Sequence, residues 1–369
     1  MQPYTPIPLP PLDIDCRRLI RPVSQANFEL ARFDGILEGI TNADLLLSPL
    51  TKEDAVRSSR IEGTQATLND VLEYEAGISK SDVIREDIQE IQNYREAARM
   101  GTQLPVEQPI TLYFIRSLHQ TLMQGVRGEL KSPGMFRRTQ NYIGAPESTL
   151  EQASFVPPDP IRLSEFLEDF ERYLQTDDDE VLIQTAIVHA QFELLHPFND
   201  GNGRIGRLLI PLFLYHKHKL SQPVFYISGY LERHREKYYQ HLREISVTGN
   251  WNDWIEFFMQ AVTIVARSNH QRVQDILELY REMMEMVQKE THSQYTMKIV
   301  DELFDHPKFR VSDFIRQLGV HPNTARDALN RLRDAKILEE LSTGKGRRSS
   351  VLAFSRLLTI TGAWEINKF

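Results

Sequence analysis

The sequence predicts a mainly α-helical protein with a small inserted β-hairpin and a C-terminal winged helix-turn-helix. Apolar residues recur at helical spacing over most of residues 24–288, which is typical of amphipathic helices that pack on a core. Residues 131–160 interrupt this pattern with proline, glycine and a short β-type run. After about residue 289 the pattern changes again, to two short helices followed by a hairpin.

Length and composition describe an ordinary globular chain. The 369 residues carry 43 basic and 51 acidic side chains, a net charge of −8, which argues against a protein that coats nucleic acid along its whole length. Cys16 is the single cysteine, so we exclude an intrachain disulfide and interpret it as an incidental thiol. The proline-rich start lacks the features of a secretory signal, and no apolar run has the length of a membrane span. We therefore expect a soluble, cytoplasmic protein.

The N-terminal third is predicted to be an extended arm followed by helices. Residues 1–12 contain five prolines and should be extended. Apolar positions then recur at helical spacing, with breaks near Asn42 and Gly63. The predicted helices of this third cover residues 24–72, 82–100 and 111–125.

A buried helical pair is predicted at the centre of the chain. Residues 181–195, VLIQTAIVHAQFELL, are apolar around most of the helix circumference, which indicates a central, buried helix. It should stop at His196, because Pro197 follows. A new helix should begin near Gly203, with Pro211 expected to kink it or to cost one hydrogen bond. Further helices are expected at residues 163–174, 231–245 and 251–288.

The loop between these two helices, residues 196–207, reads HPFNDGNGRIGR. Gly201 and Gly203 allow a tight turn and a close approach to a ligand. The amides that follow can form an anion-binding nest, which the N-terminus of the next helix reinforces. Arg204 and Arg207 supply positive charge for phosphate oxygens. The loop lacks the GK[ST] ending of a Walker loop, and it follows a helix where a dinucleotide fingerprint follows a strand.

Two more side chains of this loop can supply chemistry. Asp200 is a hard oxygen ligand suited to the Mg²⁺ that accompanies a polyphosphate. His196 precedes the nest and could accept a proton from an attacking hydroxyl. A base, a metal ligand, an anion nest and a cationic clamp therefore lie within one short segment. The segment predicts an enzyme that transfers part of a nucleotide to another molecule.

The same segment matches the Fic family signature, HPFx[DE]GN[GK]R, at every specified position, and residues 110–260 resemble the whole Fic core. The resemblance implies transfer of AMP from ATP to a hydroxyl of a target protein. His196 would be the general base and Asp200 the Mg²⁺ ligand. The resemblance also implies that the phosphates are held by Gly201, Asn202, Gly203, Arg204 and, at the γ-phosphate, Arg207.

Several further residues are implied by this resemblance. Asn199 is expected at the ATP site. Tyr238 looks placed to contact the adenine, although Tyr239 adjoins it and a packed helix aromatic is an equal alternative. The inserted segment at residues 131–160, called the flap from here on, is similar to the family's target-docking element. Its strand should pair with the backbone of the target. The flap residues are Gln140, Asn141, Tyr142 and Ile143.

An inhibitory element is also implied. Residues 58–63, SSRIEG, place Ser58 and Glu62 on one helix face, and Gly63 should end that helix. The pattern is similar to the family's inhibitory motif, [ST]xxxE[GN]. The resemblance implies that Glu62 forms a bidentate salt bridge with Arg207 and so occupies the cation that the γ-phosphate needs. We therefore expect a self-inhibited enzyme.

The C-terminal segment is predicted to be a winged helix. Helices are expected at residues 311–318 and 322–334, with Pro322 at a helix-starting position. A hairpin follows, with Lys345, Arg347 and Arg348 at its tip. Residues 292–369 carry 13 basic and 9 acidic side chains. This layout suits DNA binding, and a purely protein-binding winged helix is the open alternative.

Two other interpretations of the sequence stay open. Related enzymes could transfer UMP or phosphate, although Gly203 favours AMP, and a nucleotide-sensing DNA-binding regulator is a different class of function. Trp251 and Trp254 would suit a homodimer interface.

The expected organisation has four parts. They are an N-terminal helical segment at 1–105 with an inhibitory helix at about 51–63, a Fic core at 106–262, a linking helix at 263–291 and a winged-helix-like domain at 292–369.

Overall fold

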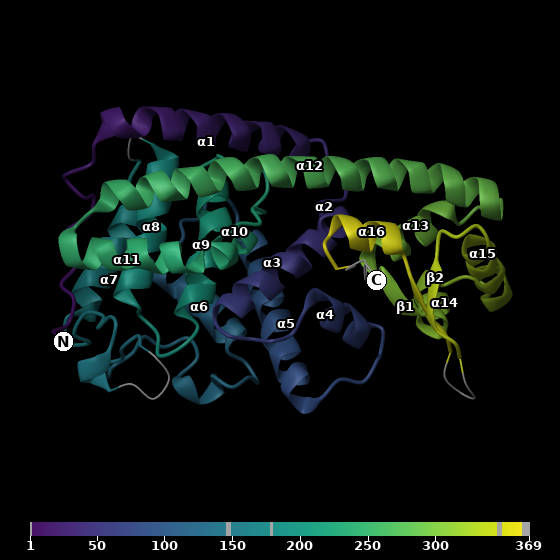
Figure 1. Ribbon diagram of the computed structural model, residues 1–369, viewed down its shortest axis with the longest axis horizontal. Coiled ribbons are helices and arrows are strands. Elements are labelled where there is room, and N and C mark those ends of the chain that lie inside the picture. The colour runs from purple at the N-terminus through teal and green to yellow at the C-terminus, as the bar shows by residue number, and fades with distance from the viewer. Residues whose placement is uncertain (1, 145–148, 178–179, 345–348, 364–369) are drawn as a thin grey trace. The chain divides into compact units, whose positions relative to one another are not determined.

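A computed structural model describes residues 2–144, 149–177, 180–344 and 349–363 (Figure 1). The chain is mainly helical, with one three-stranded sheet among these residues. It separates into two compact units. The first contains Met1–Glu38, Arg57–Thr64 and Gln89–Asn269, and the second contains Gly39–Val56, Gln65–Ile88 and His270–Phe369. No helix in the described part of the chain is both long and apolar enough to cross a membrane.

The first unit is built around two consecutive helices, α8 (Val181–Leu195) and α9 (Asn202–His216). Almost every residue of α8 is buried, and so is α9 from Asn202 to Leu214, as the apolar run predicted. The helix α9 continues through Pro211. The helices that pack on this pair are α1 (Cys16–Leu37), α7 (Leu163–Gln175) and α11 (Arg235–Thr248) against α8, and α6 (Leu112–Leu122) against α9.

The remaining helices of the chain follow the predicted pattern closely. The predicted break near Asn42 separates α1 from α2, and α3 ends before Gly63. The segment predicted as one helix at 231–245 is two helices, because the chain turns at His234. These helices are α2 (Ala43–Leu46), α3 (Ser48–Ile61), α4 (Leu68–Glu75), α5 (Asp82–Thr102), α10 (Ser228–Arg233) and α12 (Trp251–Thr291).

The flap is less regular than a β-hairpin. Among the described residues its strand pairing is a single antiparallel bridge between Ile143 and Phe155. Two short 3-10 turns lie near this bridge: η1 (Glu129–Lys131) precedes it, and η2 (Leu150–Gln152) lies between its two partners. The tip of the segment, residues 145–148, lies outside the described residues.

The second unit contains the predicted C-terminal helices at their predicted bounds, α14 (Val311–Leu318) and α15 (Pro322–Asp334). Its sheet has the order β1-β3-β2, with both pairs antiparallel. The first strand, β1, and the last helix, α16, were not predicted. The basic tip residues Lys345, Arg347 and Arg348 lie outside the described residues. The other elements are α13 (Thr296–Asp305), β1 (Lys308–Arg310), β2 (Glu339–Ser342), β3 (Val351–Ala353) and α16 (Ser355–Ile360).

Candidate active site

The loop between α8 and α9 has a left-handed residue at each end. His196 caps α8 with φ 47° and ψ 58°, a conformation that costs a residue with a Cβ on the order of 1 kcal/mol. Gly201 begins α9 with φ 75°, which glycine adopts freely. Asn202 closes the loop, since its Oδ1 accepts from the Phe198 amide at 2.8 Å and its Nδ2 donates to the Phe198 carbonyl at 2.8 Å. The loop is therefore fixed at both ends and across its middle.

His196 is a neutral imidazole near neutral pH. Burial lowers its pKa to about 4, against smaller opposing effects from the Glu193 carbonyl and the Glu62 carboxylate. Nδ1 lies 3.3 Å from the Glu193 carbonyl oxygen. A carbonyl only accepts, so this contact assigns the proton to Nδ1 and leaves Nε2 as the basic nitrogen. The side chain thus has the protonation state that a general base needs.

Arg207 and Glu62 meet at the start of α9. Arg207 Nη2 lies 2.6 Å from Glu62 Oε1, and the two side chains are 1% and 32% exposed. Burial by itself would raise the pKa of Glu62, but the neighbouring Arg207 cation outweighs it and lowers the pKa overall. Gly63 has φ 105° and follows the end of α3, as predicted. The structure thus brings together the two residues that the sequence analysis paired.

The form of this pair differs from the expected bidentate bridge. A single oxygen of Glu62 contacts the guanidinium. The remaining donations go to Ser58, from Arg207 Nε to Ser58 Oγ at 2.9 Å and from Nη2 to the Ser58 carbonyl at 2.9 Å. The expected contact of Arg207 with both carboxylate oxygens is thus replaced by contacts with one oxygen of Glu62 and with Ser58, in the last turn of α3.

Glu62 also lies directly over the helix N-terminus. A Cβ placed on Gly203 would lie 2.2 Å from Glu62 Oε1 and 2.8 Å from Arg207 Nη1. A helix N-terminus attracts anions, and here a carboxylate of the same chain lies beside its first turn. Glycine at position 203 is required for this close approach.

Arg204, one turn before Arg207 in α9, has a different acidic partner. Its Nη1 donates to Glu90 Oε2 at 2.9 Å, and these side chains are only 5% and 8% exposed. Glu90 Oε1 also accepts from Arg127 Nε at 2.8 Å. A second, longer contact of 3.5 Å joins Arg204 Nη2 to Asp200 Oδ1. Sequence reasoning assigned Arg204 to phosphate and missed its pairing with Glu90.

Asp200 is the one loop carboxylate that remains accessible. Its side chain is 45% exposed, and its Oδ1 accepts from the Gly201 amide at 2.6 Å. No group of three or more metal-ligating side chains occurs among the described residues. A single exposed carboxylate beside an anion site still fits Mg²⁺, which proteins often hold through one or two carboxylates together with substrate phosphates.

Two bracing residues of the loop were missed by the sequence reasoning. His119 Nδ1 accepts from the Gly134 amide at 2.9 Å, and its Nε2 lies 2.9 Å from the Asp200 carbonyl. Its ring stacks on Phe198 at 3.7 Å, and burial lowers its pKa to about 4. Arg137 holds the other end of the loop through the His196 carbonyl. The signal for both lay inside the segments that resemble the Fic core.

A third buried group, Glu193, faces the same turn of α9. A Cβ on Gly206 would lie 2.3 Å from Glu193 Oε1, and this oxygen has no hydrogen-bond partner within the described part of the chain. Burial raises the pKa of Glu193 to about 8, and the Glu62 carboxylate adds to the rise against the opposing effect of Arg207. Arg207 is therefore flanked by one ionised and one largely neutral carboxyl group at pH 7.

The structure separates the two tyrosines considered for the adenine. Tyr238 is completely buried, accepts or donates at 2.9 Å with His189 Nε2, and packs on Trp254. Tyr239 is 39% exposed, and the charges of Glu62 and Arg207 act on its pKa. The packed-aromatic alternative therefore describes Tyr238, and Tyr239 is the accessible member of the pair.

The flap residues are connected to the loop. Asn141 Nδ2 donates to the Phe198 carbonyl at 3.0 Å, and Gln140 Nε2 donates to the Pro157 carbonyl at 3.0 Å. Tyr142 and Ile143 are 43% and 39% exposed. The other residue expected at the nucleotide, Asn199, donates from Nδ2 to the Lys131 carbonyl at 3.5 Å. An accessible edge thus lies next to the loop that carries His196.

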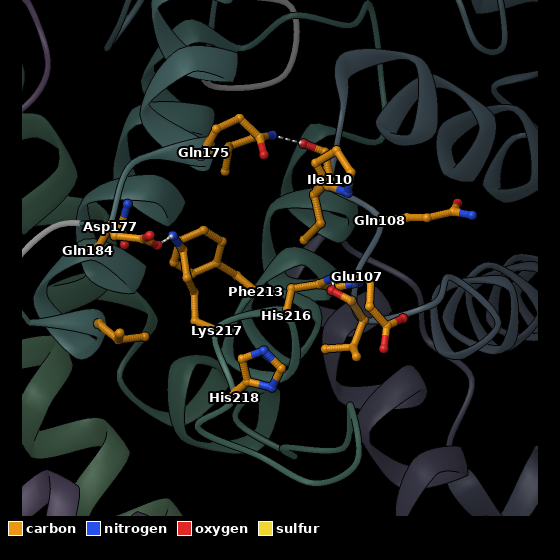
Figure 2. A pocket seen from close by; sticks show the side chains of 14 residues that line it. Glu107, Gln108, Ile110, Gln175, Asp177, Gln184, Phe213, His216, Lys217 and His218 are labelled. Carbon is orange, nitrogen blue, oxygen red and sulfur yellow. Dashed lines mark hydrogen bonds and ion pairs between the residues drawn. The ribbon is translucent and has the colours of Figure 1, made fainter.

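A separate cavity of about 430 Å³ lies at the far end of α9 (Figure 2). Its lining includes His216, Lys217 and His218 but none of residues 196–207. Lys217 Nζ lies 3.1 Å from Asp177 Oδ1, and Gln175 Nε2 donates to the Ile110 carbonyl at 2.8 Å. The candidate site is therefore the loop itself and not this cavity.

Family models match most of this chain. The Fic/DOC family model matches residues 109–214, the model of the family's N-terminal region matches residues 20–103, and a C-terminal domain of SoFic-like protein adenylyltransferases matches residues 279–348. The chain belongs to the Fic/DOC family. Residues 196–207 and residues 58–63 both lie within the matched segments.

Relatives and solved structures agree with this membership. The chain is 30% identical over 151 residues to a protein adenylyltransferase Fic of Culex quinquefasciatus, covering 40% of this chain and 27% of that protein. It is 26% identical over 201 residues to a probable protein adenylyltransferase of Aquifex aeolicus, covering 54% and 56%. The chain thus spans between about a quarter and just over half of these relatives.

The fold is shared with Fic proteins of known structure. A Fic family protein from Desulfovibrio desulfuricans aligns over 96% of this chain and 98% of its own, with a TM-score of 0.56 at 19% identity. A Fic domain protein from Bacteroides thetaiotaomicron aligns over 70% of this chain and 97% of its own, with a TM-score of 0.55 at 18% identity.

Proposed function

We propose that this protein is a self-inhibited protein adenylyltransferase. It transfers AMP from ATP to a Ser, Thr or Tyr hydroxyl of a target protein or of itself, and it releases pyrophosphate. One observation carries the proposal. A neutral histidine, His196, lies one short loop away from a helix N-terminus whose anion position is now filled by the Glu62 carboxylate. The names of the relatives and of the C-terminal family model support the same chemistry.

In the proposed reaction, Nε2 of His196 accepts the proton of the target hydroxyl. The hydroxyl oxygen then forms a bond to the α-phosphorus while the bond to the bridging oxygen of the β-phosphate breaks, and pyrophosphate leaves with its electrons. The amides of residues 201–203, with Asn199 and Asn202, bind the phosphates. Asp200 would hold Mg²⁺, which supplies positive charge against the phosphate oxygens. The accessible edge at Tyr142 and Ile143 would dock the target backbone.

Self-inhibition follows from the position of Glu62. Its carboxylate contacts Arg207 and lies over Gly203, where a phosphate would otherwise meet a cation and a helix N-terminus. ATP therefore competes with Glu62 for Arg207, and it binds without the γ-phosphate clamp. Removing the carboxylate frees both features together.

The test is label transfer with purified protein, Mg²⁺ and ATP labelled in turn at the α- and γ-phosphate. Wild type, Glu62→Gly and His196→Ala are compared. We expect α-label on protein, strongest in Glu62→Gly, and at least a 100-fold loss in His196→Ala, since general bases contribute roughly 10²–10⁴ in rate. Transfer in Glu62→Gly that is no greater than in wild type would refute the inhibitory role, and α-label retained in Glu62→Gly/His196→Ala would refute the role of His196.

The same experiment decides between the remaining readings. γ-label alone would indicate phosphate transfer, and label from UTP in place of ATP would indicate UMP transfer. If no variant transfers label although each binds ATP, the nucleotide-sensing regulator with a DNA-binding C-terminal unit becomes the better reading. In that case the full chain should bind DNA through residues 292–369, and His196→Ala should leave its affinity for DNA unchanged.

A further inference from the structure

Arg137 is a buried cation that contacts carbonyl oxygens. The residue is only 2% exposed. Within the described part of the chain its guanidinium donates to carbonyls and not to carboxylates. Burial lowers its pKa to about 10 against the smaller opposing effect of the Asp159 carboxylate, so it keeps its charge at neutral pH. Burying a charge without a direct ion pair is costly, and the carbonyls around it must therefore compensate it closely.

The carbonyls belong to two different segments. On the side of α8, Nε donates to the His196 carbonyl at 2.9 Å and Nη2 lies 3.4 Å from the Leu195 carbonyl. On the side of the flap, Nη2 donates to the Pro158 carbonyl at 2.5 Å and Nη1 lies 3.5 Å from the Thr139 carbonyl. The Arg137 amide donates to the Pro197 carbonyl at 2.8 Å. One side chain thus ties the end of the buried helix to the segments that enter and leave the flap.

The geometry explains why an arginine is needed here. The carbonyls at the end of α8 are the negative pole of that helix, which a cation stabilises. A guanidinium offers five donors in a fixed fork, whereas an ammonium offers one nitrogen on a flexible stem. The fork can hold the His196 carbonyl and the Pro158 carbonyl in fixed relative positions. That contact also holds His196 in its left-handed conformation, which the residue would not adopt freely.

We propose that Arg137 is a positioning residue that fixes the backbone of His196 and couples its orientation to the flap. The inference rests on the proposed role of His196 as base. Target docking on the flap edge and alignment of the base are then one event, because both segments hold the same guanidinium. A displaced flap would move the guanidinium that holds the His196 carbonyl, and a mispositioned base loses rate steeply, by on the order of 100-fold for a shift of about 1 Å.

The variants are Arg137→Met, Arg137→Lys and, as a matched control, Arg138→Met, which removes an exposed arginine from the next position. Transfer is measured in the Glu62→Gly background. For Arg137→Met we expect a roughly 100-fold fall in kcat with a KM for ATP within about twofold of the control. Arg137→Lys keeps the charge but loses the fork, and kcat should fall about tenfold. Arg138→Met should match the parent.

A second readout does not depend on activity. The imidazole of His196 is titrated by NMR in the otherwise wild-type chain, and its resonance is assigned by its loss in His196→Ala. The charges that act on it are those of Glu62, Asp200 and Arg137. Arg137→Met removes a cation and loosens the loop, so the pKa of His196 should rise by roughly half a unit. Arg137→Lys should leave that pKa close to its wild-type value.

The outcomes separate this inference from the proposed function. If Arg137→Met unfolds cooperatively and its kcat and His196 pKa equal those of Arg138→Met, the inference is overturned. If Arg137→Met does not fold, Arg137→Lys decides, and a kcat equal to that of the control overturns it. If Glu62→Gly transfers no label at all, the proposed function has failed, and an unchanged His196 titration in Arg137→Met then overturns the positioning role as well.

Discussion

The N-terminal end of α9 carries two arginine–glutamate pairs that differ in construction. Arg204 pairs with Glu90, which lies within α5, and both side chains are almost fully buried. Arg207 pairs with Glu62, which lies just beyond the end of α3 and is 32% exposed. Glu90 is further held by Arg127, whereas the pair at Arg207 shares its donors with Ser58.

The difference indicates separate purposes for the two arginines. A pair in which both side chains are buried is costly to break, because each partner would be left as an uncompensated charge. A pair whose acid stands at a helix end, with water access, can exchange its carboxylate for another anion at lower cost. We therefore regard Arg204–Glu90 as a fixed support of the loop and Arg207–Glu62 as the contact that a phosphate can replace.

The largest expected effect tests this division through stability. Glu90→Ala should lower the free energy of unfolding by about 3–5 kcal/mol, because it leaves Arg204 buried without its ionic partner. Glu62→Ala should cost about 1 kcal/mol, since Ser58 still accepts from Arg207 and water can enter the 32% exposed position that the carboxylate leaves. Urea unfolding followed by tryptophan fluorescence measures both. Equal losses in the two variants would contradict the division, and so would label transfer enhanced in Glu90→Ala to the same degree as in Glu62→Ala.

A smaller expected effect concerns Glu193, whose pKa responds to Arg207. It is measured as the dependence of the free energy of unfolding on pH. The pKa of Glu193 is raised to about 8 in the fold from an ordinary value of 4.5, so the fold favours the protonated acid. The resulting stabilisation is fully present below pH 4.5 and is lost as the pH rises towards 8. Relative to Glu193→Gln, the free energy of unfolding of the wild type should therefore fall steadily over that interval.

The Glu62→Gly background sharpens this test. Without the Glu62 carboxylate, the repulsion that helps to raise the pKa of Glu193 disappears while the attraction of Arg207 remains. The loss of unfolding free energy with rising pH should then become smaller and occur at lower pH. If the free energy of unfolding depends on pH in the same way with and without the Glu62 carboxylate, the two carboxyl groups do not share Arg207.

The features that the sequence predicted are those written in local patterns. The loop, the Glu62–Gly63 helix end and the bounds of α14 and α15 depend on spacings of a few residues. The position of Tyr238 was also readable, because Tyr238, Leu242 and Ile245 are the buried stripe of α11. Spacings of four and three residues put that tyrosine on the core face.

The features that were missed depend on partners distant in the chain. Arg204 and Glu90 are separated by 114 positions, and Arg137 and His196 by 59. A buried arginine has the same local sequence signature as an exposed one, since its burial is decided by the helices that fold over it. The pairing of Arg204 with Glu90 was missed for this reason, because a motif shows which cations are near a site but not which are already paired.

The smallest expected effect concerns the second carboxylate near Arg204. Asp200 lies 3.5 Å from Arg204 and is 45% exposed, and exposed ion pairs contribute about 0–1 kcal/mol. Asp200→Asn should therefore change the free energy of unfolding by less than about 1 kcal/mol, while the matched amide substitution on the buried side, Glu90→Gln, costs several times more. In the Glu62→Gly background, Asp200→Asn should raise the Mg²⁺ concentration needed for half-maximal label transfer by at least about tenfold, because one charged ligand is lost. An unchanged Mg²⁺ requirement would mean that substrate phosphates alone hold the ion, and a stability loss equal to that of Glu90→Gln would mean that Asp200, too, is part of the fixed support of the loop.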